Sequence, residues 1–111
     1  MMTVLSGDDD YGYLISDILG DNYTNAVFIF PSVGISSDMI LIAETDDPQS
    51  AYDAMESYRL ERYEAYMGYA PIEAEKIDKG FVDCCTGYAI LAVFSDIETV
   101  QELWELAKSG V

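Results

Sequence analysis

Two adjacent cysteines, Cys84 and Cys85, have side chains that could be reactive or bind a metal. They are the only thiols of the sequence. Neighbouring residues of a strand point to opposite faces of a sheet, so a disulfide between these two would be strained. The chain has no histidine, and no third ligand lies close by in the sequence to complete a metal site. We therefore expect two free thiols, one of them buried, without a redox or metal role.

A run of three aspartates, Asp8 to Asp10, could bind a hard cation through carboxylate oxygens at alternate positions. The spacing does not continue, because Gly12 and Leu14 stand at the next ligand positions of a helix-loop-helix calcium loop. Apolar residues at helical spacing follow the run instead, and an aspartate before them can cap a helix. The run therefore predicts the start of a helix over about residues 11–19, and no metal site.

A set of tyrosines and arginines lies on the long amphipathic helix pattern from about Pro48 to Tyr69. Tyrosines on the inward side of a helix are more typical of a core whose hydroxyls reach the rim than of a ligand site. They are nevertheless the best candidates for a contact surface in this sequence. The candidate partner-binding residues are Tyr52, Arg59, Tyr63 and Tyr66.

The sequence contains no recognisable catalytic motif. Without histidine, nucleophilic catalysis of the Ser-His or Cys-His kind has no base, and no glycine-rich phosphate loop or Walker lysine is present. With 21 acidic residues, pairs of carboxylates at hydrolase-like spacing arise by chance. We expect no catalytic residue, no cofactor and no metal, and hence a protein that is not an enzyme.

The strong negative charge restricts the partners. The 21 acidic residues stand against five basic ones, which gives a formal net charge of -16 over 111 residues. Such a surface repels nucleic-acid phosphates and anionic lipid head groups, and it favours a basic protein partner. No apolar run reaches the roughly 18 to 20 residues of a membrane-spanning helix. The charge is explained either by solubility or by an acidic face that mimics a nucleic acid.

Four short apolar runs predict strands. Residues 26–30 and 39–43 are β-branched or aromatic, which is typical of strands. Residues 80–85 and 88–94 flank a Thr-Gly pair at residues 86–87, the spacing of a two-residue hairpin with glycine in its turn. These runs predict an antiparallel sheet.

Capping signals mark the helices between and after these strands. Asp47 precedes Pro48, an aspartate cap with proline at the first helical position. Ser95 and Glu98 have the spacing of a capping box at the start of the last helix. Residues 72–79 are mixed and predict a solvated turn or a short helical piece.

The predicted fold class is α+β, in a single domain over residues 1–111. Residues 1–5 are too short for an assignment, and the remaining order is α-β-β-α-β-β-α. This order predicts a two-layer sandwich, with a mainly antiparallel sheet of about four strands and helices packed on one face.

Three segments carry a resemblance to a known family: residues 35–44, residues 69–73 and residues 87–96. Together they resemble the bacterial domain-of-unknown-function family numbered 4358, over about residues 23–106. The resemblance implies an exported lipoprotein of Gram-positive anaerobes, extracytoplasmic and non-enzymatic, with no catalytic residues to carry over. Residues 1–20 show neither a signal peptide nor a lipid-attachment cysteine, so a complete chain would instead be cytoplasmic.

These observations lead to two functional hypotheses. The first is a non-enzymatic accessory module, on the cell-surface side, that binds another protein. The alternative is an acidic inhibitor or antitoxin, in the manner of anti-CRISPR proteins, that blocks a basic groove on its partner. The sequence leaves the oligomeric state open, although its charge opposes a dimer through the edges of the sheet.

Overall fold

A five-stranded antiparallel sheet forms the centre of the protein in a computed structural model, which describes residues 2–32 and 34–110. Met1, Val33 and Val111 of the predicted domain lie outside the described residues. The strands follow the order β1-β2-β3-β5-β4, and every neighbouring pair is antiparallel. They are β1 (Met2–Leu5), β2 (Asn25–Phe30), β3 (Met39–Glu44), β4 (Phe81–Cys85) and β5 (Tyr88–Val93). The predicted α+β class is confirmed, and β1 adds a fifth strand to the four that were expected.

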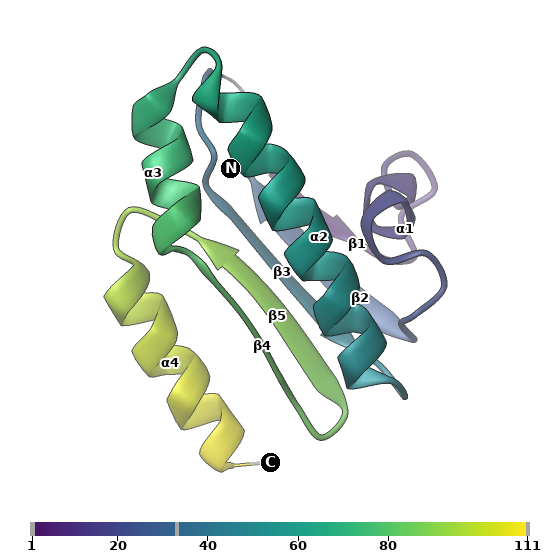
Figure 1. Cartoon of the computed structure of the whole chain (residues 1–111). Helices are drawn as coiled ribbons and strands as arrows, with labels where there is room; N and C mark the ends of the chain where they lie inside the picture. Colours follow the sequence, from purple (N-terminus) through teal and green to yellow (C-terminus); the bar gives the residue numbers. More distant parts are fainter. Residues whose placement is uncertain (1, 33, 111) are drawn as a thin grey trace.

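Three helices cover one face of this sheet: α1 (Tyr13–Leu19), α2 (Pro48–Met67) and α3 (Pro71–Lys79). In Figure 1, α2 crosses in front of the sheet and α3 lies next to α2. Helix α1 lies on the other side of α2, toward β1 and β2. The main apolar cluster lies between these helices and the sheet and includes fully buried Met55, Ile77 and Leu91. This side of the protein is called the closed face below.

The long helix α2 begins as its sequence predicts. The carboxylate of Asp47 accepts a hydrogen bond from the backbone N–H of Ser50 at 3.2 Å, and Pro48 occupies the first turn. Ala51, Met55 and Tyr66 of the predicted inward side are buried. After Met67 a short turn leads to Pro71, which starts α3.

Residues 71–79 form a regular helix, α3, where a solvated turn or a short helical piece was expected. Ala74 and Ile77, three residues apart, are fully buried against the closed face. These two apolar side chains pack the helix against the core, whereas Ile72, the other large aliphatic residue of α3, is exposed.

The last helix, α4 (Ile97–Ser109), lies on the opposite face, which corrects the prediction that all helices pack on one side. Ala89, Leu91 and Val93 of β5 belong to the closed-face cluster. Ile90 and Ala92, the alternate residues of the same strand, form a second cluster with Trp104 of α4. Because β5 is apolar on both of its sides, it requires cover on both faces of the sheet.

Helix ends differ in detail from the sequence-based expectation. Asp96 caps α4 by accepting from the N–H of Thr99 at 3.3 Å, so the expected capping box from Ser95 is not formed. No side chain caps α1, which begins only at Tyr13. Asp8 instead accepts from the N–H groups of Asp10 and Tyr11, at 2.8 Å each, and thereby folds the turn before the helix.

The predicted hairpin is confirmed. Cys85 pairs with Tyr88 across a two-residue turn that contains Gly87. The backbone of Gly87 has a φ of 86°, a conformation that L side chains rarely adopt.

Candidate functional site

Two of the four predicted partner-binding residues on α2 are engaged inside the protein. Tyr66 is only 8% exposed, and its hydroxyl donates a hydrogen bond to the backbone oxygen of Ser36 at 3.1 Å. Arg59 forms an ion pair with Glu56 and donates from Nη1 to the carbonyl oxygen of Ile77, at 3.1 Å, near the end of α3. These contacts hold the β2–β3 loop and α3 against α2.

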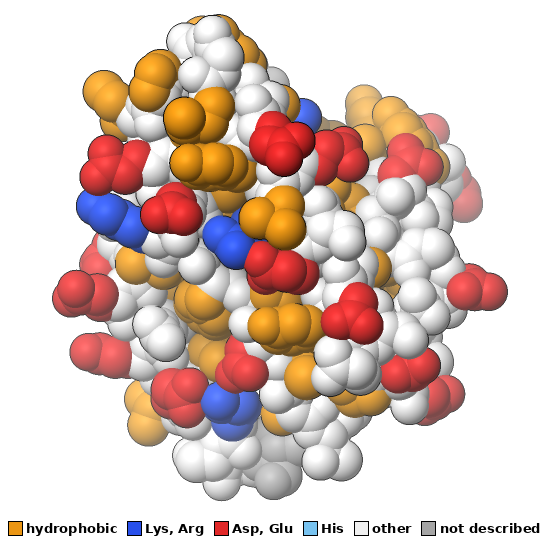
Figure 2. Space-filling view, in the orientation of Figure 1, with side chains coloured by type: hydrophobic (Ala, Val, Ile, Leu, Met, Phe, Trp, Pro, Cys, Tyr) orange, Lys and Arg blue, Asp and Glu red, His pale blue; other side chains and the backbone are white. Residues whose placement is uncertain are grey.

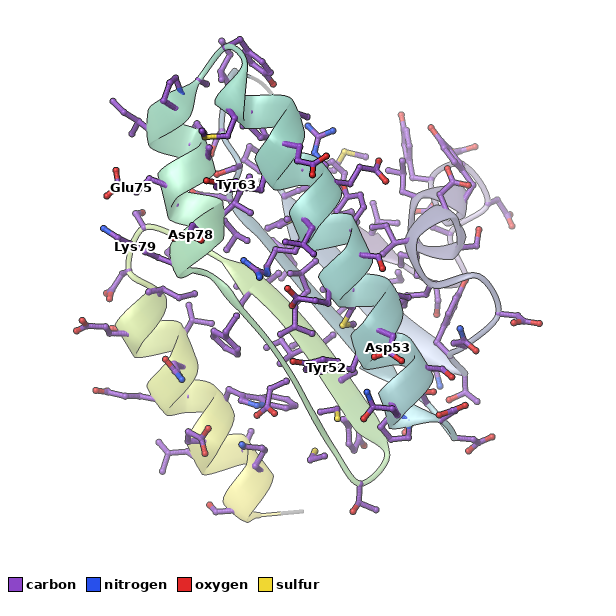
Figure 3. All side chains as sticks on the ribbon, viewed as in Figure 1. Tyr52, Asp53, Tyr63, Glu75, Asp78 and Lys79 are labelled. Carbon is purple, nitrogen blue, oxygen red and sulfur yellow. The ribbon has the colours of Figure 1, made fainter. Side chains whose placement is uncertain are left out.

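The other two residues, Tyr52 and Tyr63, are partly buried and lie far apart along α2. Tyr63 extends toward α3 and packs on the closed-face cluster, whereas Tyr52 extends toward β4 (Figure 3). The structure therefore does not bring the four residues together into one patch. Their role in partner binding stays a prediction.

A polar cluster next to the contact between Tyr66 and Ser36 also stabilises the fold. Ser37, which is 5% exposed, donates its backbone N–H to the carboxylate of Glu73 at 2.6 Å. Lys76 bridges that carboxylate at 3.0 Å and the carboxylate of Asp38 at 2.8 Å. Burial would raise the pKa of Glu73, but the hydrogen bonds from Ser37 and Lys76 lower it below its ordinary value. This cluster fastens the β2–β3 loop to α3.

The face of the sheet that carries α4 is covered only in part. Trp104 packs on Ile90 and donates its ring N–H to Asp83 of β4 at 2.8 Å. Lys108 donates to the same carboxylate at 2.8 Å. These contacts place α4 over β4 and β5, at the edge of the sheet where Figure 1 shows it, and away from β1 and β2.

Beyond α4, five apolar side chains of three strands remain partly exposed to solvent. We call this surface the open face. It consists of Leu5 on β1, Val27 and Ile29 on β2, and Ile40 and Ile42 on β3, of which the last two also border the α4 cluster.

Cross-strand pairing arranges the open face in rows. Leu5 pairs with Val27, which pairs with Ile42, and Ile29 pairs with Ile40 in the next row. Leu5 is 60% exposed. Val27 and Ile29 belong to neither of the two apolar clusters among the described residues.

A polar rim closes one end of the open face. Glu44 accepts hydrogen bonds from Asn25 at 2.9 Å and from Thr24 at 3.2 Å, and Tyr88 donates to it at 3.4 Å. The bonds from Asn25 and Thr24 hold the pKa of Glu44 below its ordinary value, so this carboxylate is ionised at neutral pH.

The rim also borders two hollows of the surface. The larger, of about 690 Å³, has the carboxylates of Glu44 and Asp8 on its walls, together with Leu5, Val27 and Ile42. A smaller apolar hollow of about 240 Å³ shares Ile42 and Tyr88 with it and reaches Trp104 and Ala107 of α4. The open face therefore continues to the side of α4, with negative charge at one end.

The predicted free thiols are confirmed, but both are partly buried where one buried thiol was expected. Cys84 packs on the closed-face cluster and Cys85 on the α4 cluster, in accordance with the alternation of a strand. Within residues 2–32 and 34–110, no three side chains of the metal-ligating types gather in one place. No helix in the described part of the chain is long and apolar enough to cross a membrane.

The acidic residues are dispersed on the side that carries α2 and α3. Figure 2 shows red carboxylates there among orange apolar and blue basic side chains, with no continuous acidic stripe. A nucleic-acid mimic would present its carboxylates in rows that follow the phosphate spacing. The dispersed pattern on this side is that of a solvated surface.

Comparisons with known proteins give no match to a family model, to a curated protein or to a solved structure. The resemblance to family 4358 stays a prediction.

Sequence reasoning missed the open face. Its signal lies in the paired strands β2 and β3, whose residues are apolar on both sides. A half-solvated strand would alternate apolar and polar residues, so Val27, Ile29, Ile40 and Ile42 indicate a second apolar surface.

Proposed function

We propose that the protein is a non-enzymatic interaction module that binds a basic amphipathic helix of another protein on its open face. The observation that carries this proposal is the row of partly exposed apolar side chains on β1, β2 and β3, beside a helix whose cluster extends only as far as Ile40 and Ile42 of β3. Contiguous exposed apolar surface on a folded domain is typical of a contact site.

The dimensions of the open face favour a helix as its occupant. Neighbouring strands are about 4.8 Å apart, so β1 to β3 span about 10 Å. A helix with its side chains has a diameter of about 10 to 12 Å. A partner helix would therefore lie next to α4 and complete the second helical layer.

The charges favour a basic partner. Glu44 and Asp8 border the larger hollow at one end of the open face, and Glu44 is held ionised by its hydrogen bonds. A lysine or arginine next to an apolar stripe on the partner would meet these carboxylates. A second copy of this chain is disfavoured, because each copy has a net charge of -16.

The test is site-specific photo-crosslinking in the cells that produce the protein. A photoreactive amino acid at Leu5 lies at the exposed border of the open face, and one at Ile72, 80% exposed on α3, is the control. We expect a covalent adduct with a basic protein from position 5 and none from position 72. Adducts from both positions, or from neither, would contradict the proposal.

A matched pair of substitutions then measures binding to the partner so identified. Ile29→Ser removes a central side chain of the open face, and Ile72→Ser makes the same change on α3. We expect Ile29→Ser to weaken binding by about tenfold or more, because one buried apolar side chain contributes about 1.5 to 3 kcal/mol. Ile72→Ser should leave the affinity unchanged, and binding should weaken as salt is added.

A further inference from the structure

Arg62 differs from the other four basic residues of the chain. Each of the others has a carboxylate within 4.0 Å, whereas Arg62 has none among residues 2–32 and 34–110. Its neighbours three and four positions away on α2 are Tyr58, Arg59, Ala65 and Tyr66, none of them acidic. In a chain with 21 acidic residues, an arginine without a carboxylate partner requires an explanation.

The guanidinium of Arg62 lies at a cavity of about 290 Å³ on the closed-face side, between α1, α2 and the β2–β3 loop. Its Cζ is 5.1 Å from the centre of the ring of Tyr66. The hydroxyl of Tyr66 is fixed by its hydrogen bond to Ser36. Stacking on a ring uses the flat face of a guanidinium and leaves the N–H groups in its plane free to donate.

Tyr58 supplies a second donor at this cavity. Its hydroxyl makes no hydrogen bond to a described residue, and the side chain is partly buried. Burial raises the pKa of Tyr58, although Arg62 lowers it, so the hydroxyl keeps its proton at neutral pH. Asp38 also borders the cavity, but Lys76 neutralises its charge at 2.8 Å.

Part of the remaining wall is apolar, and Ser36 and Ser37 of the β2–β3 loop border the cavity as well. The apolar part is formed by Leu14, Phe28, Phe30, Met39 and Ile77. At about 290 Å³ the cavity is just below the usual range for ligand sites, about 300 to 1,000 Å³, so it suits a body of about one ring.

We propose that this cavity binds a small monocarboxylate with a flat apolar body. Arg62 donates two parallel hydrogen bonds to the carboxylate, Tyr58 donates a third, and the body lies against Phe28 and Phe30. A dianion such as phosphate is disfavoured, because it lacks the apolar body and is repelled more strongly by the negative chain. This site is independent of the open face, which lies on the other side of the sheet.

The test is a titration of the whole protein with benzoate, followed by NMR shifts of the backbone amides around the cavity. Benzamide has the same ring without the charge, and acetate has the carboxylate without the ring. We expect each of them to bind at least about tenfold more weakly than benzoate. Equal binding of benzoate and benzamide would overturn the role of Arg62, and equal binding of acetate would overturn the role of the apolar walls.

Substitutions assign the effect to Arg62. Arg62→Gln should weaken benzoate binding by about tenfold or more, and Arg62→Lys should also weaken it, because lysine lacks the planar fork. Lys79→Gln removes the same charge from an exposed ion pair on α3 and should change the affinity by less than about twofold. Tyr58→Phe should produce a smaller loss than Arg62→Gln.

Unchanged benzoate affinity in both Arg62 variants would overturn the proposal. Absence of any shift in the wild-type protein up to on the order of 10 mM benzoate would overturn it as well. Arg62→Lys retains the charge and the aliphatic stem, so it keeps the test decisive if Arg62→Gln does not fold.

Discussion

The two faces of the sheet carry similar apolar side chains, but helices cover only one of the faces across its whole width. On the closed face, α1, α2 and α3 bury residues from four of the five strands, from Val4 on β1 to Leu91 on β5, and pack on partly buried residues of β4. On the other face, α4 buries Ile90 and Ala92 but leaves Val27 and Ile29 partly exposed. Apolar content alone thus does not distinguish the buried core from the partly exposed surface in this protein; the position of α4 does.

The polar residues show the same contrast. On the closed face, Arg59, Tyr66 and Glu73 connect α2, α3 and the β2–β3 loop. At the open face, Glu44 and Asp8 border a hollow of the surface. The tyrosine-rich side of α2 therefore stabilises the fold, and the less covered apolar surface is the one that we propose as a contact site.

The largest effect should come from the closed face. Leu91→Ala removes a fully buried side chain at the middle of β5, where neighbouring elements cannot collapse into the space. We expect the free energy of unfolding to fall by about 3 kcal/mol, within the range of 2 to 5 kcal/mol for such changes. Urea denaturation measures it, and a loss below about 1 kcal/mol would mean that the two faces are equally loosely packed.

A smaller loss is expected from the cluster that fastens the β2–β3 loop. Glu73→Gln leaves the ammonium of Lys76 with one carboxylate fewer and weakens the bond to the N–H of Ser37. We expect a loss of about 1 to 3 kcal/mol in the free energy of unfolding. Glu75→Gln is the matched control, since its pair with Lys79 is exposed and contributes less than about 0.5 kcal/mol. Equal losses in both variants would refute a special role for Glu73.

The attachment of α4 should depend on pH through Asp83. Burial would raise the pKa of Asp83, but hydrogen bonds from Lys108 and Trp104 lower it below the ordinary value of 3.8. The folded protein thus prefers the ionised carboxylate, whose stabilisation is present above pH 3.8 and lost as the pH falls through the lowered pKa.

Asp83→Asn should therefore cost about 1 kcal/mol at neutral pH, and the difference from wild type should vanish in strong acid. Trp104 is the only tryptophan, so its fluorescence reports the attachment of α4 directly. A difference between the two proteins that grows as the pH falls would have the wrong sign and would exclude this account.

The smallest effect on stability is expected at the open face. Ile29→Ser changes a side chain that lies outside both apolar clusters of the described residues, so the free energy of unfolding should fall by less than about 1 kcal/mol. The same variant should have the largest effect on partner binding. A loss of 2 kcal/mol or more, as in a core substitution, would show that this surface belongs to the folded core.

Local signals in the sequence predicted much of the fold. Asp47 and Pro48 fixed the start of α2, and the Thr-Gly pair fixed the β4–β5 hairpin. Both signals act through hydrogen bonds and dihedral angles within a few residues, so they can be read from a short segment.

The missed features depend on contacts between distant parts of the chain. The apolar stripe of α4 shows that this helix packs against something, but it does not say on which face of the sheet. The absence of acidic residues three and four positions from Arg62 can be read from the sequence, whereas the cavity beside it requires α1, α2 and the β2–β3 loop together. The sequence indicates the tyrosines of α2 as contact candidates because tyrosine is a common contact residue.

The two neighbouring thiols provide an internal reporter for each layer of the molecule. Cys84 lies under the closed-face helices and Cys85 under α4, so a single step along β4 places one probe on each side of the sheet. Burial raises the pKa of the Cys84 thiol, which makes it slow to react while its layer stays packed. Loosening of α4 alone would expose Cys85 to a thiol reagent before Cys84. The ratio of the two reaction rates therefore reports which layer has opened.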